Sequence, residues 1–341
     1  MVPRGMCKMN KKIKVTVLCL AYNQERFIRD CLDGFVMQKT KFPFEVLVHD
    51  DASTDGTAKI IQEYAEKYPD IIKPILQTEN QWSRGVNIWK NHMWPLIRGE
   101  YVAICEGDDY WTDPYKLQKQ VDFLDSHPDY SVCFHPVRVT WDDKRKPDCI
   151  WSRSKKNTLE LSDLLKRNFI STVGVMYRWR DECKNLFPDI ILPGDWYLHL
   201  LHAQVGKIGY LPDVMAVYRR NNGGVWTGAN KTDDWFIKTV IPHLNFYKCA
   251  MNQFNHNYTN EMSQLAAGGI CAFFRAGQMD KIELIHNNYP EIWNNAIQRL
   301  NGIDVGQIQN KLTKYKHWFN RLVGVCIMLL LITITMVIIA C

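Results

Sequence analysis

The sequence predicts an α/β protein whose core is a doubly wound, mostly parallel β-sheet. In residues 13–127, short apolar runs alternate with segments in which apolar residues recur at helical spacing, and this alternation is typical of βαβ units. Two of the runs end in clusters of acidic residues, and open parallel sheets bind ligands at the carboxyl ends of their strands. The chain has 341 residues, 46% of them hydrophobic, so it is long enough to bury a large core.

Four apolar runs in the first half are predicted to be strands, because each is short and rich in β-branched or aromatic residues. They cover residues 14–20, 44–49, 71–76 and 101–105. Helices are predicted between these strands, at residues 27–36, 60–68 and 86–96. A further helix is predicted to begin at Asp113-Pro114, since aspartate is a good N-cap and proline a good first helical residue.

The second half has a less regular pattern. We predict strands at residues 131–140, 170–177, 207–210 and 214–218, with helices at 159–167 and 197–205. The polar, basic segment 141–157 is predicted to be a mobile loop, and residues 219–226 are predicted to be another loop. Helical spacing begins again at residue 233 and continues to residue 299.

Three carboxylates lie within four residues directly after the fourth predicted strand, and we call residues Glu106–Asp109 the acidic turn. Acidic groups at the end of a buried strand repel one another unless a cation lies between them. Mg²⁺ and Mn²⁺ prefer oxygen ligands, and Mg²⁺ often takes only one or two carboxylates plus substrate phosphates. The acidic turn is therefore a candidate metal site, and the alternative is a solvated turn that binds nothing.

Other charged residues are candidates for the same edge of the sheet. Asp50 and Asp51 follow the second predicted strand, so they can share one cleft with the acidic turn. Asp195 follows a glycine where a helix is predicted to start, and its carboxylate is either a catalytic group or a plain N-cap. Arg84 and Arg219 could pair with phosphates, although an ordinary surface position is the alternative for each.

Several other classes of site are excluded. The segment Asp51–Gly56 opens like a calcium-binding loop, but Gln62 stands where that loop needs a bidentate glutamate. Neither a glycine-rich dinucleotide motif, nor a P-loop, nor a Gly-x-Ser-x-Gly hydrolase motif is present. The net charge of +6 comes without a long basic stripe, which disfavours nucleic acid as a partner. The 11 cysteines have no framework spacing, which favours a reducing compartment.

Three motifs, taken in order, resemble the nucleotide-binding half of glycosyltransferase family 2. They are strand–Ala21-Tyr22-Asn23, strand–Asp50-Asp51-Ala52-Ser53-Thr54-Asp55-Gly56-Thr57 and strand–Glu106-Gly107-Asp108-Asp109. Gly194-Asp195-Trp196 and the segment from Tyr218 to Trp226 resemble the acceptor-side elements of that family, so the resemblance covers residues 13–227. It implies a GT-A fold and the transfer of a sugar from a nucleoside diphosphate to an acceptor hydroxyl, with inversion.

The resemblance also implies roles for residues at matching positions. Asp195 would be the general base, and Asp108 and Asp109 would hold Mg²⁺ or Mn²⁺. The nucleotide would contact Ala21, Tyr22, Asn23, Asp50, Asp51, Arg84, Glu106 and Gly107, and a glycan or lipid-linked acceptor would contact Trp111, Trp196, Arg219 and Trp226. The implied organisation is a GT-A domain at 13–230, divided into halves at 127/128, followed by a helical region at 231–317.

Two departures from the family pattern leave alternatives open. Glu106 stands where the family has an aspartate, and Asn221 and Asn222 occupy the region where many members carry a histidine. One alternative is therefore a membrane-held module that binds a sugar nucleotide or glycan without catalysis. A nucleotidyltransferase is a second alternative, which the match at Asp195 disfavours.

The C-terminal residues 322–341 form an uncharged run of 20 residues. At 1.5 Å per residue such a helix is about 30 Å long, which matches the hydrocarbon thickness of a bilayer. Lys311, Lys314, Lys316 and Arg321 precede the run, with Trp318 and Phe319 at the expected interface. Basic flanks favour the cytoplasmic side, so we expect one membrane crossing with the catalytic domain in the cytoplasm, acting in assembly of surface polysaccharide or lipopolysaccharide. A buried C-terminal helix is the alternative.

Overall fold

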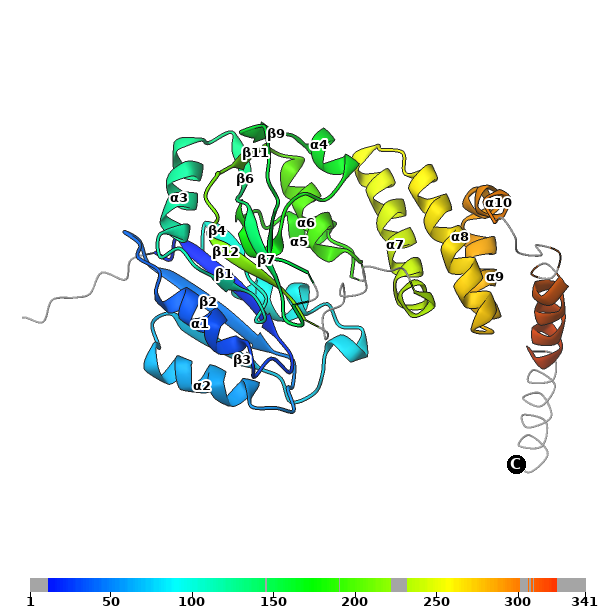
Figure 1. Ribbon diagram of the computed structural model, residues 1–341, viewed down its shortest axis with the longest axis horizontal. Helices are drawn as coiled ribbons and strands as arrows, with labels where there is room; N and C mark the ends of the chain where they lie inside the picture. The colour runs from blue at the N-terminus through cyan, green and yellow to red at the C-terminus, as the bar shows by residue number, and fades with distance from the viewer. Residues whose placement is uncertain are drawn as a thin grey trace, which may run out of the picture. The chain divides into compact units, whose positions relative to one another are not determined.

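The computed structural model describes residues 12–144, 146–189, 191–221, 232–300, 306, 308 and 310–323. The chain divides into two compact units, Met1–Thr227 and Gly228–Cys341. Figure 1 shows the strands gathered in the first unit and helices in the second. The candidate site residues of the sequence all belong to the first unit.

The first unit is built on an eight-stranded sheet in the order β3-β2-β1-β4-β10-β6-β11-β9. Strands β3, β2, β1 and β4 are parallel to one another, and β11 is parallel to β6. Strand β10 lies between β4 and β6 and is antiparallel to both. Because the other central strands are parallel, the expectation of an α/β protein with a mostly parallel sheet is confirmed. The bounds are β1 Val15–Ala21, β2 Phe44–Asp50, β3 Ile72–Leu76, β4 Tyr101–Ile104, β6 Tyr130–Phe134, β9 Thr158–Leu159, β10 Val175–Arg178 and β11 Lys207–Tyr210.

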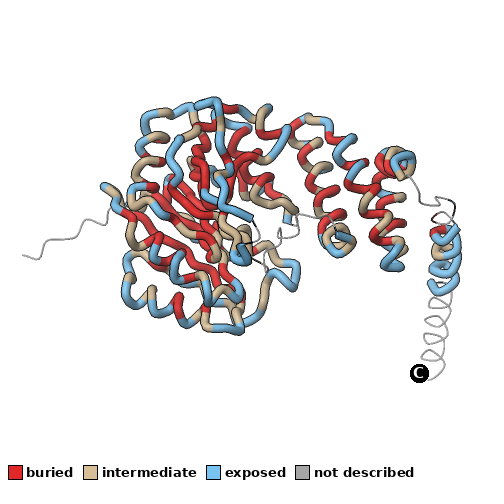
Figure 2. Tube along the Cα trace, viewed as in Figure 1, coloured by how far each residue is buried: buried red, intermediate tan, exposed pale blue. Residues whose placement is uncertain are grey.

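One apolar cluster in the core of this unit joins helices to the central strands, and Figure 2 shows those strands buried along most of their length. Helix α1 buries Ile28, Leu32 and Phe35 because its apolar residues recur at helical spacing. Helices α2 and α3 contribute Ile61 and Val121 to the same cluster. The helices of the unit are α1 Ile28–Val36, α2 Thr57–Lys67, α3 Lys116–Ser126, α4 Leu161–Lys166, α5 Cys183–Leu186 and α6 Gly194–Ala203.

A second sheet of four strands was not predicted. Its order is β5-β12-β7-β8, with bounds β5 Tyr110–Trp111, β7 Val137–Trp141, β8 Cys149–Trp151 and β12 Ala216–Arg220. The single strand expected at 131–140 is wrong, because β6 belongs to the large sheet and β7 to the small one. The chain passes between the sheets at His135-Pro136, where proline has no N–H to continue a ladder.

Three other sequence predictions need correction. Residues 141–157 are not a loop throughout, since β8 pairs antiparallel with β7. Residues 86–96 form a π-helical turn at Trp89–Met93 and a 3-10 turn at Trp94–Leu96 in place of a regular helix. Helix α3 begins at Lys116, because Asp113 accepts the Tyr115 N–H at 2.8 Å in a turn that precedes the helix.

Among its described residues, the second unit contains the helices α7 Asp233–Phe254, α8 Thr259–Arg275, α9 Met279–Asn288 and α10 Pro290–Gln298. Helical structure also covers residues 310–323. In the described part of the chain, no helix combines the length and the apolar character that a bilayer crossing needs. The crossing expected at 322–341 lies outside the described residues except for its first two.

Candidate active site

The acidic turn lies at the carboxyl end of β4, beside the end of β1. The Cys105 N–H donates to the Leu18 carbonyl at 3.0 Å, and the Gly107 N–H donates to the Leu20 carbonyl at 2.8 Å. A Cβ at Gly107 would lie 2.3 Å from Gln24 Oε1 and 2.9 Å from Ile28 Cδ1. Glycine is therefore what allows the turn to pack this closely against the start of α1.

Strand β12 holds the two aspartates of the turn. Asp109, which is 1% exposed, accepts the backbone N–H of Arg219 at 2.7 Å. Asp108, which is half-buried, accepts the Asn221 amide N–H at 2.7 Å. Asn221 thus lies against the carboxylate that the resemblance assigns to a cation, and Asn222 lies outside the described residues.

The Arg219 side chain also belongs to this contact. Its guanidinium donates to the Asp108 carbonyl at 3.0 Å and pairs with Asp30 of α1 at 2.7 Å. It lies 4.9 Å from the Phe27 ring centroid and 4.7 Å from that of Tyr110. These contacts leave the side chain only 10% exposed, so in this structure it ties the acidic turn to α1 and β12.

Asp195 comes to the acidic turn from a different part of the chain. It lies in the first turn of α6, which begins three residues earlier than predicted, and its Oδ2 accepts the Thr172 hydroxyl at 3.3 Å. Burial, together with the neighbouring charges of Asp108 and Asp195, raises the pKa of Glu106 to about 8. Burial likewise raises the pKa of Asp108, Asp109 and Asp195. The structure therefore brings four carboxyl groups together in one poorly solvated place.

The turn after β1 also lies at this edge of the sheet. Tyr22 is 48% exposed, and Asn23 has a positive φ of 52°, a conformation that asparagine tolerates better than most residues. The Asn23 side chain accepts the Thr54 N–H at 2.8 Å, and its own N–H donates to Ser53 Oγ at 2.9 Å. Ala21 pairs with Asp50 across β1 and β2, so the two predicted nucleotide motifs are held together.

The carboxylates of Asp50 and Asp51 are both engaged by nearby loops. Asp50 accepts the Ser53 N–H and hydroxyl at 3.0 and 2.5 Å. Asp51 accepts the backbone N–H groups of Gln81 and Trp82 at 2.7 and 3.1 Å. The Trp82 ring is 63% exposed after the neighbouring strand β3, and no sequence signal identified it.

Three residues assigned by resemblance lie apart from this arrangement. Arg84 is exposed and pairs with Glu79. Trp111 and Trp196 are 2% and 9% exposed, and their ring N–H groups donate to the Val173 and Leu164 carbonyls. Both tryptophans are core residues in this structure, and Trp226 lies outside the described residues.

The carboxylates of the acidic turn fit a site for one divalent cation shared with a ligand. Within the described residues, no group of three or more His, Cys, Asp and Glu side chains is arranged to hold a metal ion. Asp108 is half-buried, and burial is the main cause that raises its pKa and that of Glu106, with the charges of Asp108 and Asp195 adding to the shift at Glu106. Asp109 is the less suitable ligand, because it is buried against the Arg219 backbone.

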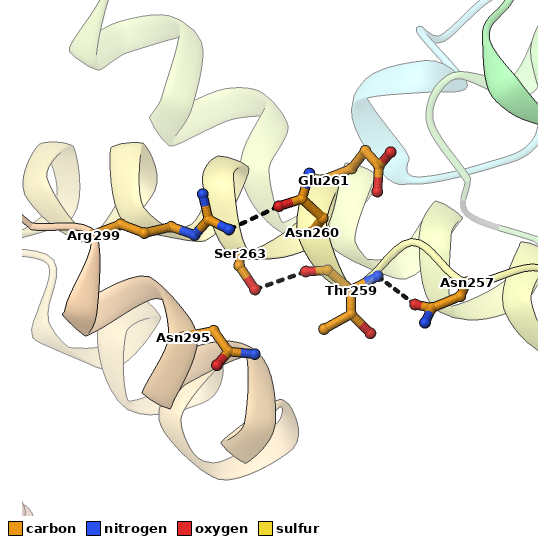
Figure 3. Close-up of a pocket in the computed structure, with 7 residues that line it drawn as sticks. All are labelled: Asn257, Thr259, Asn260, Glu261, Ser263, Asn295 and Arg299. Carbon is orange, nitrogen blue, oxygen red and sulfur yellow. Dashed lines mark hydrogen bonds between the residues drawn. The ribbon is translucent and has the colours of Figure 1, made fainter.

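A separate cavity of about 490 Å³ lies in the second unit, and Figure 3 shows the side chains that line it. The Arg299 guanidinium donates to Asn260 Oδ1 at 2.7 Å, and the Asn257 side chain accepts the Thr259 N–H at 2.9 Å. The lining residues are Asn257, Thr259, Asn260, Glu261, Ser263, Asn295 and Arg299. None of them is a residue that the sequence singled out.

Comparison with known proteins matches the first unit to a family. The profile described as "Glycosyl transferase family 2" matches residues 16–187. An uncharacterised protein of Mycobacterium tuberculosis (strain ATCC 25618 / H37Rv) is 49% identical over 215 residues, which are 63% of this chain and 61% of that protein. The putative teichuronic acid biosynthesis glycosyltransferase TuaG of Bacillus subtilis (strain 168) is 28% identical over 244 residues, 70% of this chain and 92% of that protein. This chain thus matches less than two thirds of the mycobacterial relative.

Solved structures show the same fold at low sequence identity. A crystal structure of S. aureus TarS residues 1–349 has a TM-score of 0.53 at 18% identity, covering 84% of this chain and 79% of that one. The same fragment in complex with UDP-GlcNAc has a TM-score of 0.52 at 21% identity, covering 84% and 80%. These similarities concern the fold.

Proposed function

The chain belongs to glycosyltransferase family 2, and from that premise we propose that it transfers a sugar from a nucleoside diphosphate to an acceptor hydroxyl with inversion. One observation carries the proposal beyond family membership. Thr172, which donates to Asp195 of α6, belongs to the short turn Thr172–Gly174. This turn contacts both β4, which leads into the acidic turn, and β12, whose Arg219 contacts Asp108 and Asp109. A candidate base and a candidate diphosphate site thus come from distant parts of the sequence to one place.

Direct displacement at an anomeric carbon needs a base on the acceptor side and charge stabilisation on the leaving side. We assign Asp195 as the group that takes the proton from the acceptor hydroxyl. Burial raises its pKa above the ordinary aspartate value, and a base is most effective when its pKa lies nearer the working pH. Thr172, which donates to its Oδ2, would orient the carboxylate.

On the leaving side we assign Asp108 as the carboxylate that holds Mg²⁺ or Mn²⁺, together with the donor diphosphate. A bound divalent cation supplies positive charge where the departing diphosphate gains negative charge. Asn221 donates to Asp108 and fixes the orientation of that carboxylate. The nucleoside end would lie along Tyr22, Asp50 and Asp51, with the carboxylates of the two aspartates holding the loops that surround it.

We further propose that the acceptor is a glycan of a surface polysaccharide and that the enzyme is anchored by residues 322–341. The similarity to a putative teichuronic acid biosynthesis glycosyltransferase supports the first point. The uncharged C-terminal run and the basic residues before it support the second.

The test is turnover with a panel of nucleotide sugars in Mg²⁺ or Mn²⁺, with UDP-sugars first because the TarS fragment was solved with UDP-GlcNAc. Release of nucleoside diphosphate is the expected result, whereas release of pyrophosphate would identify a nucleotidyltransferase and binding without release a non-catalytic module. Asp108→Asn should lower turnover by about 10²-fold or more and weaken cation-dependent nucleotide binding. Normal turnover in this variant, or in excess chelator, would rule out the cation assignment.

A further inference from the structure

The first strand of a basic hairpin ends beside the acidic turn. We define this hairpin as residues 137–157, which include β7, β8 and the segment between them. Strand β7 pairs in parallel with β12, and the two lie side by side in Figure 1. The pairing places Trp141 opposite Arg220, and the Asp142 N–H donates to the Arg220 carbonyl at 3.1 Å. Arg219 and Asn221, the neighbours of Arg220, both contact Asp108.

Most of the net charge of the chain lies in this hairpin. Residues 137–157 contain seven lysines and arginines and three aspartates, a net charge of +4, while the net charge of the whole chain is +6. The described cations with exposed side chains are Arg138, Lys144, Lys146, Arg153, Lys155 and Lys156. Like charges at this density repel one another and attract an anion.

The cations of the hairpin are mostly not neutralised by the protein. Lys156 pairs with Asp163 at 2.9 Å. Among the residues that the structure describes, no ion pair links an acidic side chain to Lys144, Lys146, Arg153 or Lys155. These positive charges are therefore available to a partner.

Aromatic rings accompany the cations. The Lys146 ammonium lies 5.0 Å and the Arg220 guanidinium 5.5 Å from the Trp141 ring centroid. Trp151 of β8 is 40% exposed. Exposed tryptophan between cations offers an apolar face beside groups that attract anions, a combination common in binding surfaces.

We propose that the basic hairpin binds the acceptor and that the acceptor is an anionic glycan, which carries phosphodiester or carboxylate groups along its chain. The role of this glycan as acceptor rests on the proposed function. Placement favours a glycan over a bilayer, because the end of β7 lies next to the residues that contact Asp108. A chain bound along the hairpin can therefore present a hydroxyl near Asp195. The hairpin cations hold the anionic groups, and the acidic site acts on a neutral hydroxyl.

The test compares two variants of the full chain with equal charge change. The hairpin variant carries glutamine at Lys144, Lys146, Arg153 and Lys155. The matched control carries glutamine at four exposed lysines outside the hairpin, Lys39, Lys41, Lys59 and Lys67. Binding is measured to phosphorylated dextran, polygalacturonate, unmodified dextran and vesicles of anionic phospholipid.

The wild-type protein should bind one or both anionic glycans at least about tenfold more tightly than unmodified dextran, and high salt should reduce this preference. The hairpin variant should lose about tenfold in affinity for the preferred anionic glycan, and the control about twofold or less. The two anionic probes separate phosphate from carboxylate recognition. Equal binding of neutral dextran, equal losses in both variants, or hairpin-dependent binding to vesicles alone would overturn the proposal.

Donor hydrolysis without acceptor, measured on the same preparations, separates this inference from the proposed function. The hairpin variant should hydrolyse the nucleotide sugar at the wild-type rate, because none of its changes touches the acidic turn. A wild-type protein that neither binds nor hydrolyses any nucleotide sugar contradicts the proposed function, even if the glycan binding follows the pattern above.

Discussion

At the residue scale, the site is defined by carboxyl groups held in an unfavourable environment. Glu106, Asp108, Asp109 and Asp195 all have raised pKa values, with burial as the first cause for each. Burying several acids close together costs stability, so their presence at one sheet edge favours a functional role. The cation and the acceptor hydroxyl of the proposed reaction would relieve that cost.

The first prediction concerns Asp195. Asp195→Asn should bind the donor normally but reduce kcat by about 10²-fold or more, because the amide cannot accept the hydroxyl proton. Thr172→Val, which removes only one hydrogen bond to Asp195, should reduce kcat several-fold at most. Steady-state kinetics and thermal unfolding of both variants check this. If Asp195→Asn lowers the melting temperature but leaves kcat unchanged, the residue has only a structural role in the first turn of α6.

The second prediction concerns Lys116, a buried lysine outside the proposed chemistry. It is 0% exposed, its ammonium donates to Gln120 at 2.7 Å, and it lies 4.1 Å from the Trp111 ring centroid. Burial lowers its pKa from 10.5 to about 7, against the opposing influence of Cys105, Cys133 and Asp113. Between these two pH values the unfolded chain binds more protons at Lys116 than the folded chain does, so folding stability should rise with pH in this range.

Lys116→Met removes this titration while keeping a long side chain. The free energy of unfolding of the wild type, relative to that of the variant, should increase from about pH 7 to about pH 9.5, by about 1 kcal/mol or more. Urea unfolding of both proteins at each pH measures the difference, and the other lysines and tyrosines cancel in it. A difference that does not change with pH would show that Lys116 keeps an ordinary pKa.

The sequence could predict which residues belong to the site better than it could predict what each contacts. The acidic turn, Asp50 and Asp51 lie at strand ends as expected, because parallel strands with apolar runs fix that geometry. Trp111 and Trp196 were assigned to the acceptor by position in a motif, yet both are core residues here. A motif does not report burial, which depends on distant residues such as Val173 and Leu164.

At the element scale, the end of β12 positions the acidic turn. Arg219 joins three elements: its backbone N–H donates to Asp109, and its guanidinium contacts the Asp108 carbonyl and Asp30 of α1. These partners lie between 110 and 189 residues away from Arg219 in the chain. No local pattern in the sequence predicts the contacts of Arg219 with these residues. The resemblance implied only that Arg219 contacts the acceptor.

The third prediction tests this contact. Arg219→Met removes the guanidinium contacts but keeps the N–H that Asp109 accepts, so the protein should fold. Catalytic efficiency should fall by about tenfold or more, because small displacements of a catalytic group are costly. Arg29→Met is the control, since it removes a neighbour of Asp30 on α1 that forms only an exposed pair with Glu63 of α2, and such pairs contribute little. Equal effects of the two variants on kcat/KM would contradict a positioning role for Arg219.

The pattern of apolar residues was sufficient to predict the parallel strands of the large sheet. Strands β1 to β4 match their predicted ranges to within about a residue or two, because buried parallel strands are continuous apolar runs. The second sheet was missed because its strands are short and partly polar: β8 spans Cys149–Trp151 and pairs only with β7. In such a strand, pairing with a neighbour determines the conformation more than the local residues do.

At the scale of the whole molecule, the remaining prediction is membrane attachment. Trp318 and Phe319 are 57% and 45% exposed in the second unit, and no acidic residue interrupts residues 311–321. Exposed aromatic rings among lysines and arginines are typical of the bilayer interface. The next residues, 322–341, are uncharged, and 20 apolar residues are long enough to cross the hydrocarbon core.

The full chain should therefore remain with membranes after extraction with high salt or carbonate, whereas a chain that ends before residue 318 should be released. Lys311→Gln with Lys314→Gln is the matched control, because it weakens attraction to anionic lipid but leaves the apolar run intact. That variant should still resist carbonate, since a crossing helix does not depend on surface charge. Release of the full chain by carbonate would show that residues 322–341 do not cross the bilayer. Cleavage of the first unit by protease added outside sealed cells would show that this unit faces the outside and not the cytoplasm.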